Sequence, residues 1–293
     1  MSDRTTNQHT LLLHTRPVKL KGEDHITVVT KEALDDLADQ ILTRQIPVTT
    51  EHLGFIPQIG VMEDPRVVEA SDGAFELWAI TRPLPKRTAG EPDLQALAEL
   101  PTGDCPSLTL GMSFSRRNFS DSDGLAIKDE ADIPIESDEK WSAVPPNEFI
   151  LTVAASWVAM KFAGAFVAEL GKQAGGALGA QIASWSKRSK VPERDILFTL
   201  EFEVTSQEKI VGYVIAKPDQ IEQQVSRALD ASEPLASLAA VANKQDLFPD
   251  FKTVVYVFDG RSWRLAWWTD GESVAITNWY KQNPPDTTGL LGH

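Results

Sequence analysis

The alternation of apolar and polar positions predicts a β-rich segment over residues 10–120, with one early helix. Short aliphatic runs broken by proline, glycine and aspartate indicate strands at 11–13, 26–29, 46–50, 58–62, 66–69, 75–80 and 108–114. Thr30 is a suitable N-cap for the helix. Apolar residues then recur on one face at helical spacing, at Leu34, Leu37, Ala38, Ile41 and Leu42. The pattern predicts a mostly antiparallel domain.

Residues 191–281 show a second pattern, of two strands, a helix and three strands. Strands are expected at 196–204 and 210–216, followed by a helix with Pro218 in its first turn. Asp259-Gly260 and Asp270-Gly271 then separate three β-rich runs. Asp-Gly between such runs indicates a hairpin, because glycine accepts a positive φ. The segment is therefore predicted to be a ββαβββ unit ending in a three-stranded antiparallel meander, and the whole chain to be α+β.

Residues 121–148 differ in composition from both neighbours. They carry nine acidic residues against two lysines. The acidic residues are Asp121, Asp123, Asp129, Glu130, Asp132, Glu136, Asp138, Glu139 and Glu148. Three prolines, at 134, 145 and 146, oppose helix formation. The segment is predicted to be a solvated acidic linker.

Residues 149–190 are rich in small residues. Between Phe149 and Ala168 the only charged residue is Lys161, which predicts a helix about 30 Å long. The helix either continues towards Trp185 or breaks near residues 175–176 into a helical hairpin. Glycines at a spacing of four form GxxxGxxxG at Gly171, Gly175 and Gly179. Small residues at this spacing allow another helix to approach to backbone contact.

Three uses of this glycine stripe are open. It can pack helices within the chain, it can drive oligomerisation as a glycine zipper, or it can insert into a membrane between the acidic segment and a basic cluster at 187–190. Lys161 disfavours the membrane, because a charge at mid-span costs about 2.5–3.5 kcal/mol on insertion scales.

Composition narrows the classes of function. The 293 residues carry a net charge of −14, which opposes sequence-independent binding of nucleic acid. One cysteine, Cys105, forms no intramolecular disulfide, and the N-terminus lacks the pattern of a signal peptide, so we expect a cytoplasmic protein. There is no Walker A, GxGxxG or HExxH motif, so we expect no cofactor and no metal.

A series of motifs carries a resemblance. Thr30–Ala38 is followed by Ile46-Pro-Val-Thr-Thr-Glu-His52, by Pro57-Gln-Ile-Gly-Val61 and by Phe75-Glu-Leu-Trp-Ala79. This order resembles the prohead maturation proteases of tailed phages, which share the herpesvirus assemblin fold. The resemblance covers residues 10–145 and implies a phage- or prophage-related serine peptidase.

The resemblance implies the roles of two residues. It makes His52 the general base and Ser113, in Ser107-Leu-Thr-Leu-Gly-Met-Ser113-Phe, the nucleophile. The sequence departs from the family at Ser115, where a glycine is usual, and no carboxylate stands in a recognisable motif for a third member. The alternative is that His52 is an ordinary surface histidine and Ser113 an ordinary strand residue.

Two functions follow as expectations. In the first, a prohead-protease-like domain at 10–120 cleaves a protein partner or its own chain, coupled to an assembly module in the glycine-stripe helix. In the second, the chain is a non-enzymatic effector or assembly protein that forms homo-oligomers or attaches to a membrane through that helix.

Overall fold

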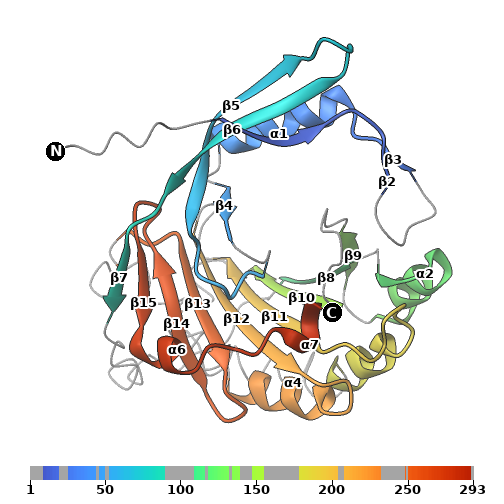
Figure 1. The fold of residues 1–293 in the computed structure, drawn as a ribbon. Helices are drawn as coiled ribbons and strands as arrows, with labels where there is room; N and C mark the ends of the chain where they lie inside the picture. Colours follow the sequence, from blue (N-terminus) through green and yellow to red (C-terminus); the bar gives the residue numbers. More distant parts are fainter. Residues whose placement is uncertain are drawn as a thin grey trace. The chain divides into compact units, whose positions relative to one another are not determined.

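The computed structural model describes residues 9–19, 26–43, 46–49, 53–89, 109–115, 118–131, 134–138, 147–154, 178–203, 208–231, 248 and 250–291 (Figure 1). The chain divides into two units. The first comprises Met1–Lys86 and Gly271–Val274, and the second comprises Arg87–Asp270 and Ala275–His293.

The first unit packs one helix on an antiparallel four-stranded sheet of order β1-β6-β5-β4. Its elements are β1 (Thr10–His14), β2 (Val18–Lys19), β3 (Ile26–Thr27), α1 (Lys31–Thr43), β4 (Pro47–Val48), β5 (Gly60–Glu69) and β6 (Phe75–Pro83). The predicted N-cap is confirmed, because Ala33 N donates to Thr30 Oγ1 at 3.2 Å. Leu34 and Ile41 of α1 are buried against Leu77 of β6, as their helical spacing predicts.

The strands predicted at 58–62 and 66–69 are one strand, β5. The register with β6 shifts between Glu63 and Arg66, and Asp64 lies between them with φ of 48°. This irregularity accommodates Pro65, which has no N–H to donate to the ladder. The proline therefore marks a bulge, whereas the sequence pattern predicted a break between two strands.

The second unit is built on a mixed sheet of nine strands in the order β7-β15-β14-β13-β12-β11-β10-β8-β9. The strands are β7 (Lys86–Ala89), β8 (Thr109–Ser115), β9 (Ile135–Asp138), β10 (Asn147–Ala154), β11 (Ile196–Glu203), β12 (Lys209–Ala216), β13 (Thr253–Phe258), β14 (Trp263–Thr269) and β15 (Val274–Thr277). The helices are α2 (Asp121–Glu130), α4 (Ile221–Asp230), α6 (Asn278–Gln282), α7 (Thr288–Leu291) and residues 178–186. The β8–β9, β10–β11 and β12–β13 pairs are parallel.

The ββαβββ order and the meander are confirmed by β11, β12, α4, β13, β14 and β15, whose last three strands are neighbours in the sheet. The two predicted turn glycines have positive φ, 90° at Gly260 and 89° at Gly271. Asp259 Oδ1 accepts from the backbone N–H groups of Arg261 and Ser262, which completes the first turn.

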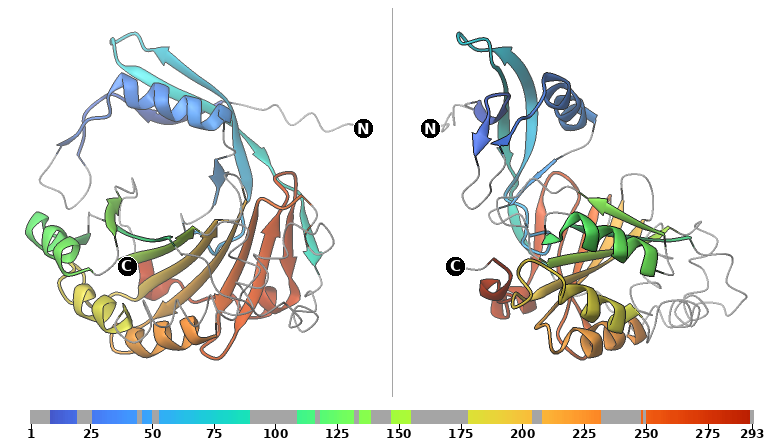
Figure 2. Two further views of the ribbon diagram at one scale, coloured as in Figure 1. Left: turned by 180° about the vertical axis from the view of Figure 1, so that it is seen from behind. Right: turned by 90° about the vertical axis from the view of Figure 1, so that its right-hand side faces the viewer.

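The core of this unit lies between one face of the sheet and two helices. Residues 178–186 and α4 lie along the same side of the sheet (Figure 2). Leu178, Ile182 and Trp185 pack there with Ile221 and Val225 of α4. Alternate strand residues complete the core, so this is the helix-covered face, and the opposite side is called the second face.

The predicted long helix from Phe149 is wrong for its first residues. Residues 147–154 form β10, which pairs with β8 and β11. Phe149, Leu151 and Val153 alternate into the core, so the lack of charge reflects a central strand. Residues 155–177 lie outside the described residues, whereas 178–186 are helical, as a helix continuing to Trp185 predicts. No helix in the described part of the chain has the length and apolar character needed to cross a membrane.

The prediction that residues 121–148 are a linker without helix is wrong for 121–130, which form α2. Ser120 caps this helix by accepting from Asp123 N at 3.1 Å. Asp121 and Asp123 lie in its first turn, where acidic side chains favour the helix dipole. Two of the nine acidic residues thus signal a helix start. The described parts of this segment belong to the second unit, and the units divide between Lys86 and Arg87.

Candidate functional site

Ser113, the predicted nucleophile, lies in β8 with a half-buried side chain. Its neighbours across the ladders are Ile150 of β10 and Glu136 of β9. His52, the predicted base, lies outside the described residues. The pairing of the two residues therefore stays a prediction.

The side chain of Ser113 belongs to the second face of the sheet. Leu110, Met112 and Phe114 of β8 enter the core on the helix-covered face, so the intervening residues point the other way. A row of register partners then crosses four strands, from Ser113 through Ile150 and Thr199 to Tyr213. Three of these four side chains carry a hydroxyl group.

The carboxylate of Glu148 is bound to a hydroxyl group of this row. Thr199 Oγ1 donates to Glu148 Oε1 at 3.2 Å, and the two side chains are only 2% and 7% exposed. Tyr213 lies beside Thr199 on the next strand. Burial raises the pKa of Tyr213 well above its ordinary value, and the charges of Glu148 and Glu201 raise it further. The phenol is therefore neutral at pH 7.

Space lies open beside Ser113 on the same face. A Cβ atom added to Gly111 would meet no atom of the described residues within 4 Å. Thr152, its neighbour in β10, is half-buried. The second face is thus accessible on one side of Ser113, whereas Glu148 is buried on the other side.

Ser115 lies at that buried side. It is 2% exposed, and its Oγ has no hydrogen-bond partner among the described residues. The ladder pairs Phe114 with Phe149, so its next step places Ser115 opposite Glu148. A buried polar atom without a partner among the described residues is uncommon in native proteins.

Of the three glycines of the stripe, the structure describes one. Gly179 lies in the helical residues 178–186, and a Cβ added there would lie 2.7 Å from Glu222 O in the first turn of α4. This glycine lets the two helices approach to backbone contact within one unit. Gly171 and Gly175 lie outside the described residues.

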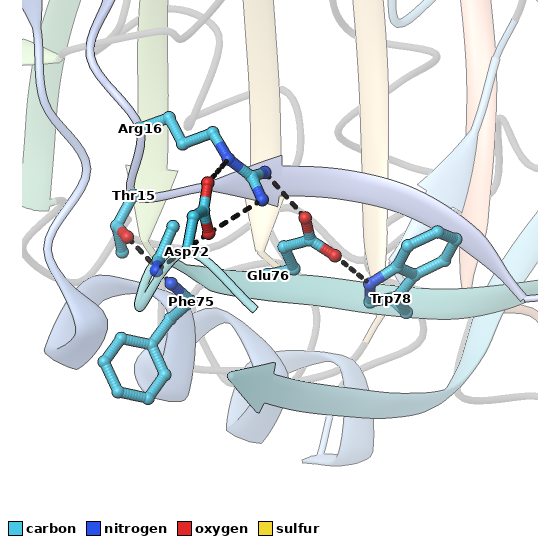
Figure 3. A network of polar contacts seen from close by, with 7 residues as sticks. Thr15, Arg16, Asp72, Phe75, Glu76 and Trp78 are labelled. Atoms are coloured by element: carbon cyan, nitrogen blue, oxygen red, sulfur yellow. Dashed lines mark hydrogen bonds and ion pairs between the residues drawn. The ribbon is translucent and has the colours of Figure 1, made fainter. Parts of the chain in front are cut away.

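A polar network in the first unit is a structural clamp (Figure 3). Arg16 donates to Asp72 at 2.8 Å and to Glu76 at 2.6 Å, and Trp78 Nε1 donates to Glu76 at 3.0 Å. These bonds lower the pKa of Asp72 and of Glu76. The network ties the chain after β1 to the β5–β6 turn, and each of its two carboxylates already has a charged partner.

Sequence reasoning named Ser113 but did not single out Glu148 or Thr199. Glu148 was counted with the acidic linker, although it is the acid that directly precedes the apolar residues of β10. Among the described residues, no group of three His, Cys, Asp or Glu side chains converges as a metal site would. The comparisons with family models, curated proteins and solved structures found no match to this chain.

Proposed function

We propose that the chain is a serine hydrolase of the peptidase type, with Ser113 as the nucleophile. Its substrate is a protein segment, from a partner or from the chain itself. The observation that carries the proposal is the position of Ser113, whose half-buried hydroxyl lies on the second face beside the open space at Gly111. The resemblance to prohead proteases supports the same residue.

The position suits a nucleophile for two reasons. A serine that attacks a carbonyl carbon needs access for the substrate and a fixed direction of approach. Strands pair with β8 on both sides of Ser113, at Ile150 and Glu136, so its backbone is held by two ladders. The adjacent space at Gly111 leaves room for a substrate backbone.

A fluorophosphonate probe tests the nucleophile without knowledge of the substrate. It reacts with activated serines, and intact-mass measurement followed by peptide mapping locates the adduct. We expect labelling at Ser113 in the wild-type chain and none in Ser113→Ala. The matched control is Ser122→Ala, an exposed serine of α2, which should label as the wild type does.

Labelling that persists unchanged in Ser113→Ala would reject the proposal. In that case the non-enzymatic alternative becomes the working hypothesis. It is tested by comparing the oligomeric state and liposome binding of the wild type with those of Gly175→Leu.

A blocking variant tests the direction of approach. The space at the Cβ position of Gly111 is open, so the side chain of Gly111→Trp can be accommodated there and should fill that space. A bulky protein substrate should then lose access, whereas Gly111→Ala should retain it. If Gly111→Trp cleaves as fast as Gly111→Ala, the substrate does not approach over Gly111.

A further inference from the structure

We propose that two copies of this chain associate by pairing their β1 strands edge to edge, as antiparallel neighbours in one continuous sheet. This contact involves neither Ser113 nor the glycine stripe, so it is independent of the proposed peptidase activity. The observation that carries it is that β1 is a sheet edge without the features that normally prevent pairing with another chain.

β1 lies at one end of the four-stranded sheet and, among the described strands, pairs with β6 alone. None of its residues is buried, and Leu11 is 37% exposed. Thr15 N donates to Phe75 O at 2.9 Å, and the N–H groups of successive strand residues point to opposite sides. The N–H of His14 is therefore directed away from β6, where an added strand can accept from it.

The other three edges of the two larger sheets have features that oppose such pairing. Among the described strands, β4 has only two residues and begins with Pro47. β7 contains two basic residues, and β9 contains two acidic residues. Short strands, proline and charged residues are the usual protections of a sheet edge. β1 has five residues, Thr10-Leu-Leu-Leu-His14, with no proline and no Asp, Glu, Lys or Arg, so it lacks these protections.

The composition of β1 favours a second copy of the same strand as the partner. Antiparallel pairing about a two-fold axis sets the strand against the same residues of the other copy. In β7 or β9 this arrangement brings like charges together, which destabilises a sheet. In β1 it brings together three leucines flanked by threonine and histidine. Two copies that each carry a charge of −14 repel one another, and this strand adds no further repulsion.

The pairing also covers exposed apolar surface at the edge. Leu11 is opposite Trp78 of β6, and Val68 of β5 belongs to the same face of the sheet. An added strand lies directly beside Leu11 but not beside Val68, which is on the third strand from that edge. A five-residue strand is a small contact surface, so we expect a dimer that dissociates on dilution.

Sedimentation velocity of the full chain over a range of concentrations tests the inference. We expect the wild type to shift from monomer to dimer as the concentration rises. His14→Pro removes the N–H that is directed away from β6 and should stay monomeric, since proline is tolerated at an edge where its nitrogen faces outward. His14→Ala is the matched control, because it loses the same side chain but keeps the N–H. It should dimerise as the wild type does.

A second pair of variants covers the case in which His14→Pro does not fold. Leu11→Lys places a protecting charge on the edge strand. Val68→Lys places the same charge at a residue that is 43% exposed on the same face but away from the edge. We expect the dimer to be lost in Leu11→Lys and kept in Val68→Lys. Far-UV circular dichroism and thermal denaturation establish which variants are folded.

Three results would overturn the inference. The first is a wild type that stays monomeric at every concentration up to its limit of solubility. The second is a folded His14→Pro that dimerises as the wild type does, which would place the contact elsewhere in the chain. The third is loss of the dimer in Val68→Lys as well as in Leu11→Lys, which would assign the contact to the sheet face and not to its edge.

Discussion

Two glycines in the second unit differ in the space that is available for a side chain. A Cβ at Gly179 would lie 2.7 Å from the backbone oxygen of Glu222, whereas a Cβ at Gly111 would meet nothing within 4 Å in the described part of the chain. We expect Gly179→Ala to destabilise the chain, because overpacking costs about 1–3 kcal/mol and alanine returns only about 1 kcal/mol of helix propensity. Gly111→Ala should be neutral or slightly stabilising. Urea denaturation of both variants measures the difference, and equal stabilities would show that the helices separate without cost.

At the scale of single residues, the role of a side chain could be predicted from the sequence only where the groups that it contacts lie a few positions away in the chain. Thr30 as an N-cap and Gly260 as a turn residue act within a few positions, and both were predicted. The bond between Thr199 and Glu148 joins residues 51 positions apart. It exists only because β10 and β11 pair in parallel, which no local pattern specifies. Of the described residues in this row, the sequence therefore named only Ser113, and Thr199 and Glu148 were not singled out.

At the scale of elements, an ion pair joins α2 to the turn that follows the helical residues 178–186. Arg188 donates to both oxygens of Glu130 at 2.8 Å, and Trp185 Nε1 donates to the same carboxylate at 3.1 Å. These contacts lower the pKa of Glu130, and the hydrogen bond from Arg188 has the largest effect. A lowered folded-state pKa gives stability that is present above the unfolded value and is lost as pH falls through the folded value.

We expect Glu130→Gln to be less stable than the wild type at neutral pH. The difference should shrink as the pH falls below about 4.3, the ordinary pKa of glutamate, because the wild-type carboxyl then becomes protonated too. Thermal denaturation of both proteins across this range measures the effect. Asp129→Gln, on the same helix without this contact, serves as the control. A difference that does not depend on pH would assign the loss to packing.

Elements were predictable where turns and caps flank them, and ambiguous where an apolar run stands alone. Asp-Gly turns predicted the meander β13–β15, whose strands are bounded by them. Residues 149–154 are apolar except for Thr152, and such a short run fits a buried helix or a buried strand equally. The sequence shows little alternation here, because Ile150 is apolar although it lies on the half-buried face. The strand β10 was therefore mistaken for the start of a helix.

At the scale of the whole molecule, the order of the strands could not be predicted from the sequence pattern. From β9 to β14, parallel and antiparallel ladders alternate. Which strands pair is decided by how the apolar faces of strands and helices are buried together. The α+β class and the ββαβββ order were predicted, but the nine-stranded sheet was not.

Net charge acts on the whole molecule and opposes the contribution of its ion pairs. At pH 7 the charge is −14, and such self-repulsion destabilises a folded chain. Salt screens this repulsion, and it also weakens exposed ion pairs such as Arg16–Asp72 and Arg66–Asp64. Each exposed pair contributes only about 0.2–1 kcal/mol to stability. The stability gained when salt screens the repulsion should therefore exceed the stability lost when it weakens the ion pairs. We expect sodium chloride to raise the melting temperature at neutral pH.

Near the isoelectric point, sodium chloride should no longer raise the melting temperature. At the sequence pI of about 4.8 the net repulsion vanishes, so only the ion pairs are left to be screened. We therefore expect sodium chloride to leave the melting temperature unchanged or to lower it there. Thermal denaturation by circular dichroism at both pH values, with and without salt, provides the comparison. A melting temperature that falls with salt at neutral pH would mean that the ion pairs outweigh the net charge.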